Sequence, residues 1–152
     1  MLIYTTNFNT VERLKCTGAF NNYMNSVAVS IAGDCPVNFY HYRKLAPRWA
    51  WWKEWDNKFA NNRETKESLE FYLKNYRETV LSKQDPKRVL EDLQMLSNDG
   101  TVFLCCYEEF PNFCHRYEIL RWLHENGADI TEFGYPNALD IYNNKCKDIM
   151  IC

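Results

Sequence analysis

The stretch TVFLCCYEEFPNFCHRYEIL, residues 101–120, decides the fold class of this 152-residue chain. Its first seven residues, 101–107, form a continuous apolar run without clean polar alternation. Such a run is typical of a central strand that is covered on both faces. Apolar residues at helical spacing follow over residues 115–125, and Gly127 predicts the end of that helix. We therefore expect a strand, a loop and a helix, which together begin a βα unit.

Further strands and helices are expected on both sides of this unit. Short β-rich runs occupy residues 2–6, 26–32 and 128–133, and amphipathic helical patterns occupy residues 67–81 and a segment that opens at Asp85-Pro86. This alternation predicts an α/β fold in which helices flank a mostly parallel central sheet, as a single domain over residues 1–152. Residues 11–23 allow a helix or a loop, and residues 134–152 receive no assignment.

Composition and charge exclude several classes of protein. A net charge of −2 leaves no basic field that would hold a nucleic-acid duplex by its phosphates. No apolar stretch approaches the roughly 20 residues that span a bilayer. The start, MLIYTTNFNT, lacks the basic and apolar regions of a secretory signal, so we expect a cytoplasmic protein without a membrane partner.

The seven cysteines are expected to be free thiols. An odd number cannot pair completely within one chain, and thiols stay reduced inside the cell. No CxxC spacing occurs, so the usual zinc-ribbon signature is missing.

Chemistry-bearing residues gather in the loop and helix start that follow the central strand. Cys106 and Glu108 lie at the strand's end, and Cys114, His115 and Arg116 lie at the first turn of the next helix. In open α/β sheets, ligands bind beyond the carboxyl ends of strands, where helix N-termini attract anions. We therefore expect a pocket for an anionic small molecule, with nucleotide-derived compounds as the candidate class.

Cys114 is a candidate nucleophile because a helix N-terminus stabilises a thiolate. Burial of an unreactive thiol is the alternative. Neighbouring helical residues point about 100° apart, so His115 is an awkward base for Cys114, and a base from elsewhere would serve better. His41 and Glu108 are the candidates for that base, and a capping or surface role is the alternative for each, favoured for His41. Arg116 is expected to hold the anion, unless it forms a salt bridge with Glu118 or another nearby acid.

The tryptophan-dense stretch PRWAWWKEWDNKF, residues 47–59, adds a second candidate binding feature. The basic residues Arg43, Lys44 and Arg48 flank its first tryptophans, Trp49, Trp51 and Trp52. A cation beside an aromatic ring favours a ligand that is both planar and anionic. Packing in the core is the competing explanation for these rings.

Several motifs resemble the domain of unknown function 488 (DUF488) family. LCCYEEFPNFCHR resembles the family's cysteine, loop and Cys-His-Arg signature, and YRKLAP over residues 42–47 resembles an upstream element. EFYLKNYRETVL resembles the aromatic helix, and Ile3-Tyr4-Thr5 the first strand. The matches span about residues 2–133, so the tail 134–152 has no counterpart, and Cys105 replaces the usual aliphatic residue. The resemblance implies an α/β domain that gathers the candidate residues at one end, and it supplies no reaction.

These observations predict a small α/β protein with a pocket for an anionic, nucleotide-like ligand, and they leave open whether it is an enzyme. The first hypothesis is an enzyme that acts on a nucleotide-like or other phosphate-bearing small molecule. The expected catalytic residues are Cys114, Glu108 and Cys106, and the expected ligand contacts are Arg116, His115, Arg43, Tyr4 and Trp49. No cofactor and no metal are predicted. Two alternatives stay open, namely a protein that binds the same anion without changing it, and an interaction module in which Cys106, Cys114, His115 and a distal thiol hold a metal.

Overall fold

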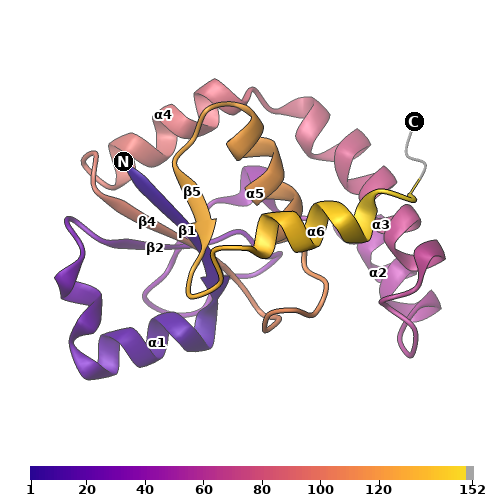
Figure 1. Cartoon of the computed structure of the whole chain (residues 1–152), viewed down its shortest axis with the longest axis horizontal. Coiled ribbons are helices and arrows are strands. Elements are labelled where there is room, and N and C mark those ends of the chain that lie inside the picture. The colour runs from indigo at the N-terminus through magenta and orange to yellow at the C-terminus, as the bar shows by residue number, and fades with distance from the viewer. Residues whose placement is uncertain (150–152) are drawn as a thin grey trace.

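Five parallel strands form the central sheet of the computed structural model, which describes residues 1–149 (Figure 1). The strands are β1 (Leu2–Asn7), β2 (Val27–Ser30), β3 (Tyr40–His41), β4 (Thr101–Cys106) and β5 (Ile130–Glu132). They lie in the order β3-β2-β4-β1-β5. The predicted α/β class with a parallel sheet is therefore confirmed.

The apolar run that opens the sequence argument becomes the middle strand of the sheet. All six residues of β4 are buried, and the strand pairs with β2 on one side and β1 on the other. A strand with neighbours on both edges and helices on both faces has no solvent-facing side, so its side chains need not alternate in polarity.

Within the described part of the chain, six α-helices surround the sheet. They are α1 (Phe8–Thr17), α2 (Trp49–Lys58), α3 (Lys66–Thr79), α4 (Pro86–Leu96), α5 (His115–Glu125) and α6 (Ala138–Cys146). In Figure 1, α1 lies on one side of the strands and α4 and α5 lie on the other, while α2 and α3 pack together beyond one end of the sheet. Among residues 1–149, no helix combines the length and the apolar character that a membrane crossing requires.

Local capping signals explain where several helices begin and end. Asp85 is the N-cap of α4, where its carboxylate accepts a hydrogen bond from the Lys87 amide at 3.1 Å, and Pro86 occupies the first turn. The ambiguous segment 11–23 divides at Gly18, whose left-handed backbone (φ 80°) ends α1 and leads into the short 3₁₀ turn Ala19–Asn22.

Strand β3 and helix α6 are among the elements that the sequence did not indicate. The strand β3 has only two residues, too few for an alternating pattern to be read. Helix α6 lies in the tail that received no assignment, and its Tyr142 is buried with the hydroxyl donating to Glu118 at 2.6 Å. That hydrogen bond ties the tail to α5.

Candidate functional site

The parallel arrangement brings the carboxyl ends of the central strands to one edge of the sheet. Asn7 at the end of β1 is in register with Cys106 at the end of β4, and Ser30 of β2 is in register with Cys105. The loops that leave β2 and β4 therefore start side by side, which is the usual place for a ligand site in this class of fold.

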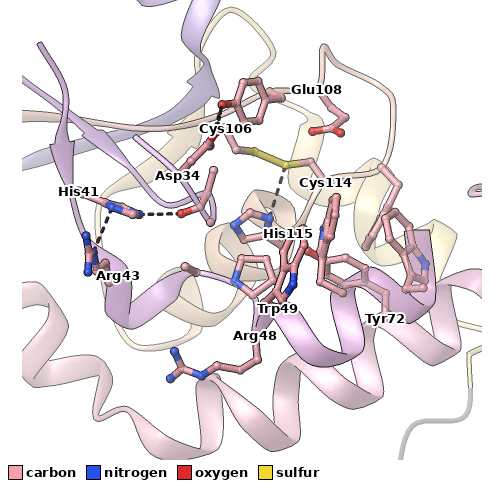
Figure 2. Close-up of a pocket in the computed structure, with 18 residues that line it drawn as sticks. Asp34, His41, Arg43, Arg48, Trp49, Tyr72, Cys106, Glu108, Cys114 and His115 are labelled. Atoms are coloured by element: carbon pink, nitrogen blue, oxygen red, sulfur yellow. Dashed lines mark hydrogen bonds between the residues drawn. A yellow bond between two sulfur atoms is a disulfide. The ribbon is translucent and has the colours of Figure 1, made fainter. Parts of the chain in front are cut away.

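A cavity of about 680 Å³ opens at this edge (Figure 2). Its lining comes from the loops after β2 and β4, from the start of α5, and from α2 and α3. The lining residues used below are Asp34, His41, Arg43, Arg48, Trp49, Trp52, Trp55, Tyr72, Cys106, Tyr107, Glu108, Cys114 and His115. A volume of this size lies within the roughly 300–1,000 Å³ of small-molecule sites.

Cys106 and Cys114 form a disulfide at the inner end of the cavity. The expectation that every thiol is free is therefore wrong for this pair, although Cys16, Cys35, Cys105 and Cys146 are free. The physical reason is that the loop 107–113 folds back, so that the end of β4 and the start of α5 meet. Spacing along the sequence gives no sign of this return.

His115 is held in one orientation behind the disulfide. It is buried, and its Nε2 lies 2.7 Å from the backbone carbonyl of Ile31, which can only accept a hydrogen bond. The hydrogen therefore sits on Nε2, and Nδ1 faces Cys114 Sγ at 3.9 Å with its lone pair free. Burial, with a smaller effect from the charge of Arg116, lowers the pKa of His115 to about 4, so the ring is neutral at physiological pH.

The argument that His115 is awkwardly placed for Cys114 is contradicted by this geometry. Cys114 is the N-cap of α5 and has an extended backbone (φ −153°, ψ 144°). The angle of about 100° between neighbours applies only within a helix, so it does not separate this pair. Cys114 Sγ and His115 Nδ1 lie 3.9 Å apart in the oxidised protein, so the imidazole nitrogen directly faces the sulfur.

Aromatic and basic side chains line the outer part of the cavity. Trp49 is 68% exposed and stacks on Trp52 with ring centroids 5.5 Å apart. Arg43 and Arg48 lie nearby, and Arg43 Nε donates to His41 Nδ1 at 3.3 Å. An aromatic wall and cations thus share one opening.

Comparison with known proteins places this geometry in a family. The family model DUF488-N3a, described as the active DUF488-N3 subclade, matches residues 37–127, which is more than half of the chain. The chain belongs to the DUF488 family. No curated protein and no solved structure matches it.

The DUF488-N3a match runs from just before β3 to just after α5. It therefore contains the disulfide, His115, Glu108 and the aromatic and basic wall. The family resemblance noted in the sequence is confirmed over this range.

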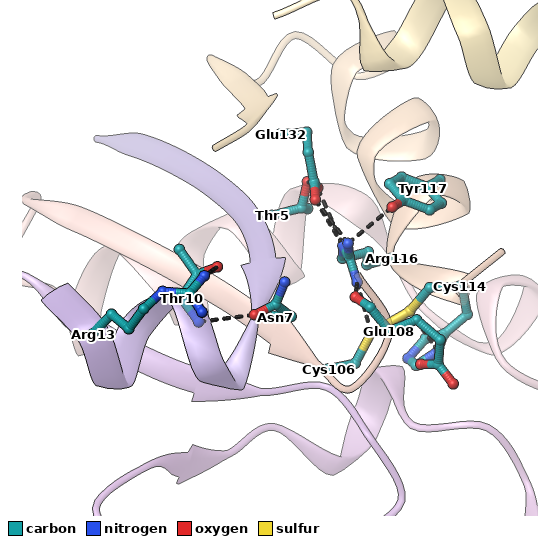
Figure 3. Close-up of polar contacts among 11 residues, drawn as sticks. Thr5, Asn7, Thr10, Arg13, Cys106, Glu108, Cys114, Arg116, Tyr117 and Glu132 are labelled. Carbon is teal, nitrogen blue, oxygen red and sulfur yellow. Dashed lines mark hydrogen bonds and ion pairs between the residues drawn. A yellow bond between two sulfur atoms is a disulfide. The ribbon is translucent and has the colours of Figure 1, made fainter. Parts of the chain in front are cut away.

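Arg116 does not line the cavity in this DUF488 protein. Its fully buried guanidinium pairs with Glu132 of β5 at 2.8 Å and donates to the Glu108 backbone carbonyl at 2.5 Å and the Tyr117 hydroxyl at 2.8 Å (Figure 3). The expected direct ligand contact is corrected, because protein groups already occupy its donors. The competing expectation of a salt bridge holds, with Glu132 as the partner in place of Glu118.

A further contact of Arg116 bears on the thiols. Its Nη1 lies 3.6 Å from Cys106 Sγ. Glu132 is held in turn by the Thr5 hydroxyl at 2.5 Å, so a fixed positive group stands beside one sulfur of the pair. Positive charge at this distance favours the thiolate form of a reduced cysteine.

Tyr4 also lies outside the cavity. Its ring packs among Tyr23, Phe103 and Phe133, with centroid distances of 5.2 to 5.9 Å. Tyr4 is thus part of an aromatic cluster against the sheet, and its expected ligand contact is corrected. Tyr4 does lie in the expected first strand, β1.

The remaining site residues divide between those the sequence indicated and those it missed. Arg43, Trp49, Glu108, Cys106, Cys114 and His115 all line the cavity, as do Arg48 and Trp52 of the tryptophan-dense stretch. Trp51 is buried instead, and its indole N–H donates to the Thr79 hydroxyl at 2.8 Å. Asp34 and Tyr72 were missed, because nothing local distinguishes a lone aspartate or a core tyrosine as part of a pocket.

Cys106, Cys114 and His115 also form a group whose donor atoms lie within 4.8 Å of one another. This is the set that the metal alternative requires. Both sulfurs are bonded to each other here, so reduction would have to precede any metal binding.

Proposed function

We propose that this DUF488 protein is an enzyme that binds a nucleotide-like anion in the cavity and acts on it with the thiol of Cys114. One observation carries the proposal. The same cavity joins an aromatic and cationic outer wall to the Cys106–Cys114 disulfide, in which Cys114 Sγ lies 3.9 Å from His115 Nδ1.

The outer wall suits a ligand that has both a planar ring and a negative charge. The face of Trp49 is open to solvent, and base–aromatic stacking contributes about 1–3 kcal/mol. Arg43 supplies the cation for a phosphate or carboxylate. The cavity also contains the acidic residue Asp34, whose carboxylate accepts a hydrogen bond from the Tyr107 hydroxyl at 2.7 Å. This hydrogen bond partly offsets the negative charge of Asp34 at the cavity.

Tyr107 fixes Asp34 at the same opening. Partial burial, followed by the hydrogen bond to Asp34, raises the pKa of Tyr107 to about 12. Its hydroxyl therefore stays protonated over the physiological range and keeps Asp34 in place.

The inner end supplies the chemistry once the disulfide is reduced. Cys114 Sγ then attacks an electrophilic atom of the bound ligand, and the bond from that atom to its leaving group breaks. The thiol proton moves to Nδ1 of His115, whose ring is oriented by the Ile31 carbonyl. Glu108 lies at the same cavity and is the candidate acid for the leaving group. The matched family model is described as an active subclade, which agrees with a catalytic role.

Binding is tested by calorimetry with adenosine monophosphate, adenosine and inorganic phosphate. We expect the monophosphate to bind best, because it alone uses both the ring and the anion contacts. Arg43→Gln and Trp49→Ala should each weaken it about tenfold, the effect of losing roughly 1.4 kcal/mol. Arg88→Gln is the matched control, because Arg88 is exposed on α4 and outside the cavity. Equal affinities for all variants would contradict the proposal.

Turnover is tested on reduced protein with a panel of nucleotides. Cys114→Ser should abolish product formation while leaving the affinity for the ligand within about twofold. Rapid iodoacetamide labelling of Cys114 near neutral pH, slowed by bound ligand, should accompany activity.

A second candidate is a protein that binds the same ligand without changing it. The disulfide favours this candidate, because it occupies the sulfur that would act as nucleophile. Native mass spectrometry separates the two. Intact ligand recovered after prolonged incubation with the reduced protein would support binding alone.

A further inference from the structure

We propose that the Cys106–Cys114 pair carries out thiol–disulfide exchange with low-molecular-weight thiols and disulfides that enter the cavity. Cys114 is the sulfur that bonds to the incoming molecule, and Cys106 is the sulfur that leaves and returns. This activity is distinct from the proposed action on a nucleotide-like ligand and needs no such ligand.

Access to the pair is limited to small molecules. Both cysteine side chains are almost fully buried, with 1% and 4% exposure, yet both line the cavity of about 680 Å³. A small thiol can therefore reach the sulfurs, whereas a folded protein surface cannot. Cys105, the neighbour of Cys106 on β4, is fully buried and does not line the cavity, and burial raises its pKa. A thiol in that setting is unreactive.

The two sulfurs have different surroundings, and this difference assigns their roles. Arg116 Nη1 stands 3.6 Å from Cys106 Sγ and is fixed by its ion pair with Glu132. Exchange is faster when the departing thiolate is better stabilised, so Cys106 is the preferred leaving group. Attack then falls on Cys114, which is also nearer to a proton acceptor, His115 Nδ1 at 3.9 Å.

Each step balances in atoms and electrons. In the oxidising direction, the Cys114 thiolate attacks a small disulfide, forms a mixed disulfide and releases one small thiolate. The Cys106 thiolate then attacks Cys114 Sγ, forms the Cys106–Cys114 bond and releases the second small thiolate. Two electrons pass from the protein dithiol to the small disulfide. The reverse sequence, with a small thiol as reductant, regenerates the dithiol.

This exchange also decides whether Cys114 is available to the proposed enzyme, because only the reduced pair has a free thiol. The proposed exchange and the proposed action on a nucleotide-like ligand can be tested independently of each other. The experiment below contains no nucleotide, and a chain that exchanges thiols while binding no nucleotide would contradict the proposed function alone.

The test uses reduced full-length protein and hydroxyethyl disulfide as the probe. Adducts are located by peptide mapping after acid quench, which separates them from adducts on the exposed Cys16. Cys106→Ser should retain a mixed disulfide on Cys114. In Cys114→Ser, occupancy at Cys106 should be about tenfold lower, because the Arg116 cation beside Cys106 favours its release as a thiolate over its mixed disulfide. Wild type should end as the internal disulfide without an adduct.

The control is Cys16→Ser, which should behave as wild type at the pair. Equal adduct at Cys106 and Cys114 in the two variants would overturn the assigned roles. A wild type that keeps the adduct on Cys114, or that binds one zinc ion per reduced chain and loses it in Cys114→Ser, would overturn the activity itself. If a variant fails to fold, the wild type alone tests the activity. Wild-type protein is equilibrated with mixtures of reduced and oxidised hydroxyethanethiol, and the Cys106–Cys114 pair should convert reversibly between dithiol and disulfide. A pair that does not convert would overturn the proposal.

Discussion

At the scale of single residues, a buried charge organises the site from outside the cavity. The Arg116 side chain links Glu132 of β5, the Glu108 carbonyl in the loop after β4, and Cys106 Sγ. A guanidinium removed from water must have its donors satisfied, and here they are. Arg116 is therefore a positioning residue that holds the strand end and the loop where Cys106 and Glu108 meet the cavity.

His115 gives a prediction at the same scale. Its folded pKa of about 4 lies below the ordinary value of 6.5, so acid protonates the ring in the unfolded chain first. Lowering the pH from 7 to 4 should therefore cost wild type about 3 kcal/mol of unfolding free energy through this residue. Denaturant unfolding of the oxidised protein across this range measures the slope. His115→Gln, whose side chain can still donate to the Ile31 carbonyl, should lose less unfolding free energy between pH 7 and pH 4 than wild type. Equal pH dependence in the two proteins would refute the lowered pKa of His115.

At the scale of elements, the sequence predicted the helix boundaries that depend on residues close together in the chain. The bounds of α5 agree with the prediction for residues 115–125, and Asp85 and Pro86 start α4 as expected. Each depends on a cap, a glycine or a helical apolar spacing within a few residues. The disulfide depends on how residues 107–113 fold back, and the role of Arg116 depends on a carboxylate sixteen positions away in the chain. Neither has a local signal.

Gly100, between α4 and β4, gives the prediction for this scale. A Cβ built there would lie 2.3 Å from the Met24 carbonyl oxygen and 2.6 Å from Asn25 Cβ. Gly100→Ala must therefore displace backbone next to the central strand, and we expect a loss of about 1–3 kcal/mol in the free energy of unfolding. Gly33→Ala is the matched control, because its Cβ would meet nothing within 4 Å. A Gly100 variant as stable as the Gly33 variant would show that the backbone can move freely here.

At the scale of the whole molecule, the cavity is made by segments far apart in sequence. Trp49 and Trp52 come from α2, Tyr72 from α3, and His115 from α5. The sequence indicated the two groups separately, as a tryptophan-dense stretch and a Cys-His-Arg turn. The two groups share one cavity because α2 and α3 pack together beyond the end of the sheet. The spacing of residues along the chain does not indicate this packing.

The proposed chemistry requires that the whole fold survive reduction of Cys106–Cys114, and this gives the last prediction. The disulfide joins residues only eight positions apart, so chain entropy assigns it about 2–3 kcal/mol. Cys106 is the last residue of β4 and both cysteines belong to the buried core, but the backbone pairing of the five strands does not depend on the disulfide. Denaturant unfolding with and without reductant should therefore show a modest loss and one cooperative transition. The double variant Cys106→Ser/Cys114→Ser should show no effect of reductant. A wild type that unfolds in reductant alone would mean that the disulfide is structural, and Cys114 would then have no folded state in which to act.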